Sequence, residues 1–331
     1  MRVGMRLGTR LGTTVRRTVL AAVIAACAAA PARAADNVTV GTVGSASANL
    51  WPVFIGLEKG FFAEKNIKID LVYVPSSAQM IQQLTAGSLD VTMSTGLVDP
   101  IRAIDRGAPI AIVRLESQSP PYALVAKSTI KSLAALKGKV ISLGGPKDIT
   151  RIYVERMLAP SGIKPGEFDM VFAGATSARA QALLSGAVDA AILLPPFNFQ
   201  ATAQGFNELG LTVDFAPELP FSGTVVNLAW AKAHQDLLTR LLAAHAKSIA
   251  WFNDDANRAE AVKMMVAASK LKPDEVEKSY DFFRKGKFFA PTGTISRKKL
   301  GALVDALVSL GDAKKIDVER LVLPGVTKIG D

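Results

Sequence analysis

Six short turns of small or polar residues stand out in this sequence, because each precedes a segment with a helical pattern. They occupy residues 44–49, 75–78, 94–96, 144–150, 174–177 and 195–198. The first backbone N–H groups of a helix have no partner within it, and the positive end of the helix dipole lies there. Serine and threonine hydroxyls add further donors. For any single hydroxyl, capping of its own helix is the simpler interpretation. Together the turns predict a site for a small ligand, and helix N-termini favour an anion.

One of these turns belongs to an internal repeat. The stretch Val72 to Met93 returns 99 residues later as Val171 to Ile192. Among the corresponding positions, Gln82, Leu84, Gly87 and Asp90 recur as Gln181, Leu183, Gly186 and Asp189. In both copies we predict a hydroxyl cap at the helix start, from Ser76-Ser77 or Thr176-Ser177, and a left-handed glycine at its end. Two copies indicate duplicated lobes and not a solenoid. We expect the recurring aspartates to support the junction of strand and helix and not to contact a ligand.

The elements around the repeat follow the same order in both halves. Apolar runs of strand length alternate with helical patterns, which predicts parallel βαβ units and an α/β fold. We predict two lobes, joined by crossings near residues 117–126 and 216–226. Lobe 1 begins at 36–118, lobe 2 spans 119–220, and 221–331 returns to lobe 1 and ends in helices. Residues 211–215 and 221–230 are expected to be extended. Because ligands bind at the carboxyl ends of parallel strands, the turns should lie on two facing rims with a cleft between them.

The charge of the chain is concentrated in its first residues. The formal net charge is +10, yet six arginines and no acidic residue lie within residues 1–35. The remaining sequence has 33 basic and 29 acidic side chains. This balance is typical of a soluble surface and argues against a nucleic-acid-binding protein.

Residues 1–35 resemble a secretory leader. Five arginines precede the apolar segment 19–30, and Ala32-Arg33-Ala34 provides a small-x-small cleavage site. The apolar segment is shorter than the ~20 residues that a membrane span requires. Arg16-Arg17 also fits a twin-arginine signal, and Ile24-Ala25-Ala26-Cys27 fits a lipobox. We therefore expect a periplasmic protein, released after Ala34 or anchored by a lipid at Cys27.

Several catalytic and metal-binding classes find no support in the residues. Cys27 is the single cysteine, and the two histidines, His234 and His245, lie too far apart along one helical pattern to share a metal. No phosphate loop, nucleophile elbow or His-Glu-x-x-His pair occurs. We expect neither a metal nor a cofactor. Further candidates for ligand contact are charged or aromatic residues near the turns, which also have ordinary surface or core interpretations: Arg102, Arg151, Arg179, Trp51, Tyr122 and Phe197.

Three separated stretches, 56–67, 80–91 and 182–197, resemble the NMT1/THI5-like family, the nitrate/sulfonate/taurine group of periplasmic substrate-binding proteins of ABC importers. The resemblance covers nearly all of residues 36–260. It implies a type II periplasmic-binding-protein fold, in which two lobes close around a small molecule by hinge motion. The contacts that it implies in lobe 1 are Ser45, Ser47, Asn49, Ser76, Ser77, Ser94 and Thr95. Those in lobe 2 are Gly145, Ile149, Thr150, Thr176, Ser177, Pro196 and Asn198.

The resemblance also implies partners and leaves alternatives open. We expect a monomer that binds a small, anionic organic or oxyanion ligand and delivers it to an ABC permease in the inner membrane. A sensory ligand-binding protein is an alternative, although no transmembrane or DNA-binding segment accompanies the lobes. A thiamine-pyrimidine-synthase-like enzyme is a weaker alternative, because that enzyme requires a cysteine-rich motif.

Overall fold

The first sheet of the computed structural model has the strand order β2-β1-β3-β10-β4. Its strands are β1 (Asp36–Val43), β2 (Ile67–Val74), β3 (Val91–Gly96), β4 (Ile110–Ser117) and β10 (Ser222–Asn227). Strand β1 runs parallel to β2 and β3, and β10 runs antiparallel to β3 and β4. All residues of β4 are buried, as expected for a sheet that is covered on both faces. We refer to this sheet and its helices as lobe 1.

The second sheet repeats this plan with the order β7-β6-β8-β5-β9. Its strands are β5 (Ala123–Ala126), β6 (Val140–Leu143), β7 (Asp169–Phe172), β8 (Ala190–Leu193) and β9 (Asn207–Leu211). Here β6 is parallel to β7 and β8, whereas β5 is antiparallel to β8 and β9. In each sheet the fourth position is therefore filled by a strand that has just crossed from the other lobe, β10 in lobe 1 and β5 in lobe 2.

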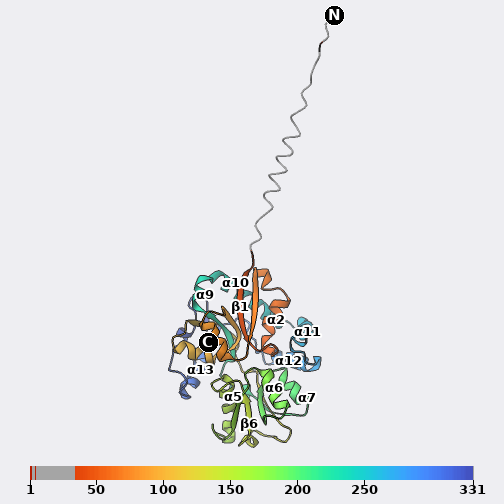
Figure 1. The fold of residues 1–331 in the computed structure, drawn as a ribbon, viewed down its shortest axis with the longest axis vertical. Helices are drawn as coiled ribbons and strands as arrows, with labels where there is room; N and C mark the ends of the chain where they lie inside the picture. Colours follow the sequence, from red (N-terminus) through yellow and green to blue (C-terminus); the bar gives the residue numbers. More distant parts are fainter. Residues whose placement is uncertain (2–3, 5–33, 331) are drawn as a thin grey trace. The chain divides into compact units, whose positions relative to one another are not determined.

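Helices cover both sheets (Figure 1), and lobe 1 carries more of them than lobe 2. Lobe 2 has α5 (Ile149–Leu158), α6 (Thr176–Leu184), α7 (Phe197–Ala203) and α8 (Thr212–Phe215). The helices of lobe 1 that precede the crossings are α2 (Trp51–Glu58), α3 (Ser77–Thr85) and α4 (Val98–Asp105). Those that follow are α9 (Leu228–Ala233), α10 (Gln235–Phe252), α11 (Arg258–Ser269), α12 (Pro273–Lys285), α13 (Arg297–Ser309) and α14 (Val318–Leu321). Single 3-10 turns occur at Ala48–Leu50, Ala63–Lys65, Leu133–Leu136, Ala159–Ser161 and Asp255–Asn257.

The C-terminal part of the chain packs on lobe 1. Backbone bonds join Leu115 N to Gly293 O at 3.2 Å and Ala290 N to Glu116 O at 2.8 Å, so residues 289–293 run along the edge strand β4. Short strands β11 (Ile295–Ser296) and β12 (Ile329–Gly330) then pair with each other. Covering β4 in this way removes an exposed sheet edge.

The structure describes residues 1, 4 and 34–330. The apolar segment of the predicted leader, with Cys27, lies outside these residues, so cleavage and lipidation stay predictions. Within the described part, no helix is long and apolar enough to cross a membrane. From Asp36 onward the chain forms one compact unit.

Two of the predicted elements are wrong in type. Residues 211–215 were expected to be extended, but β9 ends at Leu211 and α8 follows, starting at Thr212. The strand was missed because Asn207 to Leu211 has little of the β-branched character that favours strands, and pairing with β5 decides its conformation. Trp230 lies in α9 and not in an extended segment, since the Asn227 side chain caps that helix through Ala229 N and Trp230 N.

The predicted repeat is present in space, with one exception. Gly87 and Gly186 have φ angles of +78° and +80°, which confirms the left-handed ends of α3 and α6. Ser76 Oγ accepts a hydrogen bond from Gln79 N at 3.4 Å, which confirms the cap of α3. The prediction of a hydroxyl cap on α6 is wrong, because its N-cap is Ala175, which makes no side-chain cap bond.

Candidate ligand-binding site

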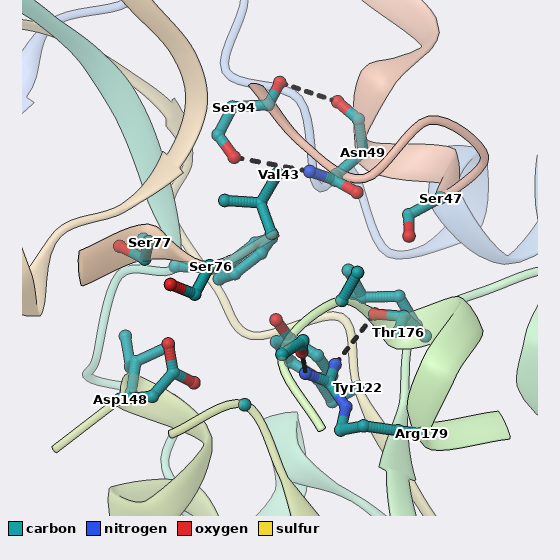
Figure 2. A pocket seen from close by; sticks show the side chains of 17 residues that line it. Val43, Ser47, Asn49, Ser76, Ser77, Ser94, Tyr122, Asp148, Thr176 and Arg179 are labelled. Carbon is teal, nitrogen blue, oxygen red and sulfur yellow. Dashed lines mark hydrogen bonds between the residues drawn. The ribbon is translucent and has the colours of Figure 1, made fainter. Parts of the chain in front are cut away.

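A cavity of about 50 Å³ lies between the two lobes and is lined by residues that follow the carboxyl ends of strands in both (Figure 2). Val43 ends β1 and Gly96 ends β3, whereas Gly144 follows β6 and Leu194 follows β8. A cavity needs ~10–15 Å³ to hold one water, so this inner cavity has room for a small polar group. It therefore suits a small head group.

The inner cavity contains half of the residues that the resemblance implied. Those that line it are Ser47, Asn49, Ser76, Ser77, Ser94, Ile149 and Thr176. Those that lie outside it are Ser45, Thr95, Gly145, Thr150, Ser177, Pro196 and Asn198. Both lobes contribute to the first group, as expected for a cleft between facing rims.

Local hydrogen bonding accounts for several residues that lie outside the inner cavity. Thr150 Oγ1 accepts a hydrogen bond from Gly144 N at 2.9 Å and donates to Asp148 Oδ1 at 2.6 Å, so it holds the turn together. Thr95 is fully buried within β3, which extends through residues predicted to begin the next helix. Asn198 Nδ2 donates to Glu208 at 3.3 Å.

The remaining residues of that group lie beside the cavity. Gly145 lines a neighbouring cavity, Ser45 is exposed, and Ser177 is half-buried one residue beyond Thr176. Pro196 is buried at the N-cap of α7. These four residues are therefore close to the rims without facing the inner cavity.

Arg179 brings a buried positive charge to the inner cavity. Its side chain is 3% exposed and is fixed by three bonds, from Nε to Ile192 O at 2.8 Å, from Nη1 to Gly174 O at 2.5 Å and from Nη2 to Thr176 Oγ1 at 2.7 Å. The guanidinium also lies 5.8 Å from the centre of the Tyr122 ring. Each terminal nitrogen has a second N–H, so the fixed fork can donate to two oxygens of a carboxylate, sulfonate or nitrate.

Asp148 brings a carboxylate to the same cavity. It is the N-cap of α5, and its Oδ1 accepts hydrogen bonds from Thr150 N at 2.9 Å and from the Thr150 hydroxyl. Gly144 is required beside it, because a Cβ there would lie 2.6 Å from Asp148 Oδ1. The same Cβ position is 3.2 Å from Arg179 Nη1, so the two charged groups are close neighbours. Between them, burial raises the pKa of the Tyr122 hydroxyl, which therefore stays protonated.

A polar network fixes the lobe 1 side of the cavity. The buried Glu116 accepts hydrogen bonds from Ser94 N at 2.9 Å, from Ser94 Oγ at 2.8 Å and from Thr224 Oγ1 at 2.5 Å. Ser94 Oγ also lies 2.8 Å from Asn49 O, and Asn49 Nδ2 donates to Ser94 O at 3.4 Å. Ser94 has a positive φ of 54°, which this network holds in place. The network thus fixes the orientation of the Asn49 amide.

The helix N-termini at the cavity differ in their free donors. The side chains of Ser76 and Asp148 cap α3 and α5. Helix α6 has no side-chain cap, and the Thr176 hydroxyl is engaged by Arg179. The first backbone N–H groups of α6, next to Arg179, are therefore free to bind an anion.

Direct contacts hold the two lobes together around the cavity. Ala48 N donates to Pro195 O at 2.8 Å, and Lys147 Nζ forms an ion pair with Asp312 at 2.6 Å. Gly174 has a φ of +70°, and a Cβ on it would lie 2.5 Å from Pro75 O, so only glycine allows this approach of the two repeat turns. The arrangement is that of lobes closed on each other.

A second, outer cavity of about 370 Å³ adjoins the inner one, and both are lined by Ser76, Ser77, Gly144 and Asp148. Arg102, Arg106, Lys147 and Phe172 also line the outer cavity. Arg102 is buried and forms an ion pair with Asp99. Arg102 is thus a wall of the outer cavity, whereas Arg179 belongs to the inner one.

The other candidates named from the sequence have structural roles. Trp51 is fully buried, and its Nε1 donates to Ala261 O at 2.7 Å within a cluster of aromatic rings. Phe197 packs in the core of lobe 2. Arg151 forms an ion pair with Glu155 at 2.7 Å along α5. His245 is fully buried in α10, and His234 lies between α9 and α10. Within residues 34–330, no cluster of three His, Cys, Asp or Glu side chains is arranged to hold a metal.

Several lining residues were not predicted as contacts, and most have no chemical signal in the sequence. Val43, Leu194 and Phe221 are apolar residues whose position depends on the tertiary structure. Asp148 did have a signal, because an acidic residue directly before a helix is a preferred N-cap and therefore lies at the rim. Because an anionic ligand was expected, a negatively charged carboxylate was not named as a contact.

A family model described as NMT1/THI5 like matches residues 47–259, which is more than half of the chain. The chain belongs to the NMT1/THI5-like family. The matched segment includes both repeat copies and the lining residues from Ser47 to Phe221. Comparison with curated protein sequences gave no match.

Solved structures similar to this family member show the fold. The alkanesulfonate-binding protein SsuA from Xanthomonas axonopodis pv. citri, bound to MOPS, superimposes with a TM-score of 0.74 and 20% identity, over 88% of this chain and 99% of that one. The nitrate-binding protein NrtA from Synechocystis PCC 6803 gives 0.63 and 15%, over 74% and 70%. The desulfurization enzyme DSZB gives 0.65 and 13%, over 88% and 97%. With the two sheet orders, these matches confirm the predicted type II periplasmic-binding-protein fold.

Proposed function

We propose that this protein is the extracytoplasmic solute-binding component of an ABC importer. It binds a small organic anion or oxyanion between its lobes and delivers the ligand to a membrane permease. The observation that carries the proposal is the buried, pre-oriented Arg179 fork beside the uncapped N-terminus of α6, in a cavity that both lobes line. The names of the SsuA and NrtA neighbours, which bind alkanesulfonate and nitrate, support this ligand class.

The way the lobes are joined supports hinge closure. The crossing segments run side by side, since Phe221 N donates to Ser117 O at 2.9 Å. Lys299 Nζ on α13 donates to Gln118 O at 2.7 Å and to Pro217 O at 2.9 Å, one carbonyl in each crossing. A ligand that touches both rims only in the closed arrangement shifts the population towards closure.

A thermal-shift screen tests the proposal. The purified protein is heated with sulfonates, carboxylates, nitrate and pyrimidines, and its melting temperature is followed. A ligand at 100 times its Kd adds ~2.7 kcal/mol to the free energy of unfolding, which is a readily measured shift. Isothermal titration then gives the Kd and stoichiometry, and small-angle scattering gives the change in radius on closure.

An enzyme is the second candidate, because DSZB shares the fold. The same screen separates the two candidates when the small molecules are recovered and analysed after incubation. A ligand that is recovered unchanged and that stabilises the protein supports a binding protein. Conversion of any of them into a product would overturn the transport proposal.

A further inference from the structure

The inner cavity presents hydrogen-bond acceptors as well as donors. Asp148 points its carboxylate into the cavity (Figure 2). Both hydrogen bonds that it accepts end on Oδ1, and no hydrogen bond within residues 34–330 ends on Oδ2. A ligand that has only hydrogen-bond acceptors could not donate a hydrogen bond to this oxygen.

Asn49 adds a second acceptor. Its side chain is 5% exposed, and its Oδ1 is buried without a hydrogen-bond partner among the described residues. The amide cannot be turned to remove this acceptor, because Nδ2 donates to Ser94 O and the exchange would place two oxygens together. Figure 2 shows the free oxygen on the side away from Ser94. An unpartnered buried acceptor costs ~1–3 kcal/mol, so a donor from the ligand is favoured there.

The charged side chains that line the inner cavity also favour a ligand that carries a hydrogen-bond donor. Asp148 and Arg179 are the charged side chains of the lining, and together they are neutral. Within the inner cavity, an anion without a donor would therefore leave one negative charge in excess, whereas Arg102, Arg106 and Lys147 line the adjoining outer cavity with Asp99. Burial raises the pKa of the Asp99 carboxyl, and the negative charge of the nearby Asp148 also raises that pKa.

We propose that the ligand carries a hydrogen-bond donor, an ammonium or N–H group, a few bonds from its oxyanion. The oxyanion binds Arg179 and the first N–H groups of α6, and the donor binds Asp148 Oδ2, with Asn49 Oδ1 as a further acceptor. Because Asp148 lines both cavities, the donor lies at their junction and the rest of the ligand extends into the outer cavity. This inference depends on the proposed function and specifies its ligand class.

Matched pairs of small anions test the inference by titration calorimetry. Each ω-amino sulfonate or carboxylate with two to four carbons is compared with the same anion without the amino group. At the best spacing, we expect the amino compound to bind at least tenfold more tightly. Plain anions that bind as tightly as their amino partners would overturn the inference and leave the proposed function intact. A protein that binds neither member of any pair would contradict both.

Asp148→Asn is the decisive variant, because asparagine is an equally good N-cap and keeps the bond to Thr150 N. The preference for the amino compound is expected to fall to about one or to reverse. Asp148→Ser, also a capping residue, serves if the first variant melts early. Asp254→Asn is the matched control, since Asp254 Oδ1 caps Ala256 N in the same way and lies outside both cavities. A preference that persists in a folded Asp148 variant would refute the assignment of the donor to this carboxylate.

Discussion

The two copies of the repeat use one position of their helix in different ways. Met80 on α3 corresponds to Arg179 on α6. Met80 is fully buried in the core, and its Cγ lies 3.2 Å from the point that a Cβ on Gly41 would occupy. Arg179 is equally buried but donates to three oxygens and lines the cavity. One backbone position thus packs the core in lobe 1 and holds the charge of the site in lobe 2.

Near their C-terminal ends the two copies are alike, because each has an aspartate in the same role. Asp90 Oδ2 accepts a hydrogen bond from Thr39 N at 2.8 Å, and Asp189 Oδ2 accepts one from Val140 N at 3.0 Å. The carboxylates thus tie the start of β3 to β1 in lobe 1 and the start of β8 to β6 in lobe 2, away from the cavity. The comparison teaches that the positions that hold strands together recur, whereas the positions at the cavity have diverged.

Exchanging the divergent residues gives the largest expected effect. Met80→Arg would bury a guanidinium in an apolar core, without the three acceptors that Arg179 has in lobe 2. We expect a loss of at least ~4 kcal/mol in the free energy of unfolding, measured by urea denaturation. Met80→Leu conserves volume and should cost less than ~1.5 kcal/mol. A folded Met80→Arg protein of nearly unchanged stability would show that the two environments are not distinct.

The reverse exchange, Arg179→Met, should act on the ligand. The variant loses the charged fork, so the Kd of an anionic ligand is expected to rise at least 100-fold, or ~2.7 kcal/mol. Stability should fall as well, because three protein oxygens lose their donor. Arg179→Lys keeps the charge without the fork and should lie between the two. Unchanged affinity in a folded Arg179→Met protein would remove Arg179 from the site.

The sequence predicted the duplicated α/β architecture because capping, glycine and alternation signals are local and strong in both copies. It could not predict which hydroxyls face the ligand. Thr176 and Ser177 look equivalent in the sequence, yet Thr176 lines the cavity and Ser177 does not. Asp148 and Phe221 come together only when the lobes meet. These long-range contacts depend on tertiary packing, which no local pattern specifies.

A second difference between the copies lies near a buried histidine, which predicts a pH dependence. The position after the repeat is Ser94 in lobe 1, bound to Glu116, and the apolar Leu193 in lobe 2. His245 packs near Glu116 and Arg114, and burial lowers its pKa to about 4. The unfolded chain therefore binds a proton that the folded one rejects, so stability is present above pH ~6.5 and is lost as the pH falls towards 4. At pH 5 this amounts to ~2 kcal/mol.

His245→Met removes this titration. Urea denaturation at pH 8 and pH 5 should show a smaller loss in the variant than in the original protein. Carboxylates elsewhere contribute equally to both proteins and cancel in the difference. Equal losses in the two proteins would show that His245 is protonated without cost.

The conserved ends of the copies give the smallest expected effect and the strictest test of the comparison. Asp90→Ala and Asp189→Ala each remove one charged bond to a backbone N–H, so each should cost ~1.5 kcal/mol of unfolding free energy. The salt bridge of Asp189 to Lys127 is partly exposed and adds little to this cost. Neither aspartate lines either cavity, so the Kd of the ligand should not change. Equal costs without loss of affinity would show that the repeat preserves the fold at one end of each lobe and leaves the other end free to diverge. A clear loss of affinity in either variant would instead mean that a change at the strand junction displaces residues that line the cavity.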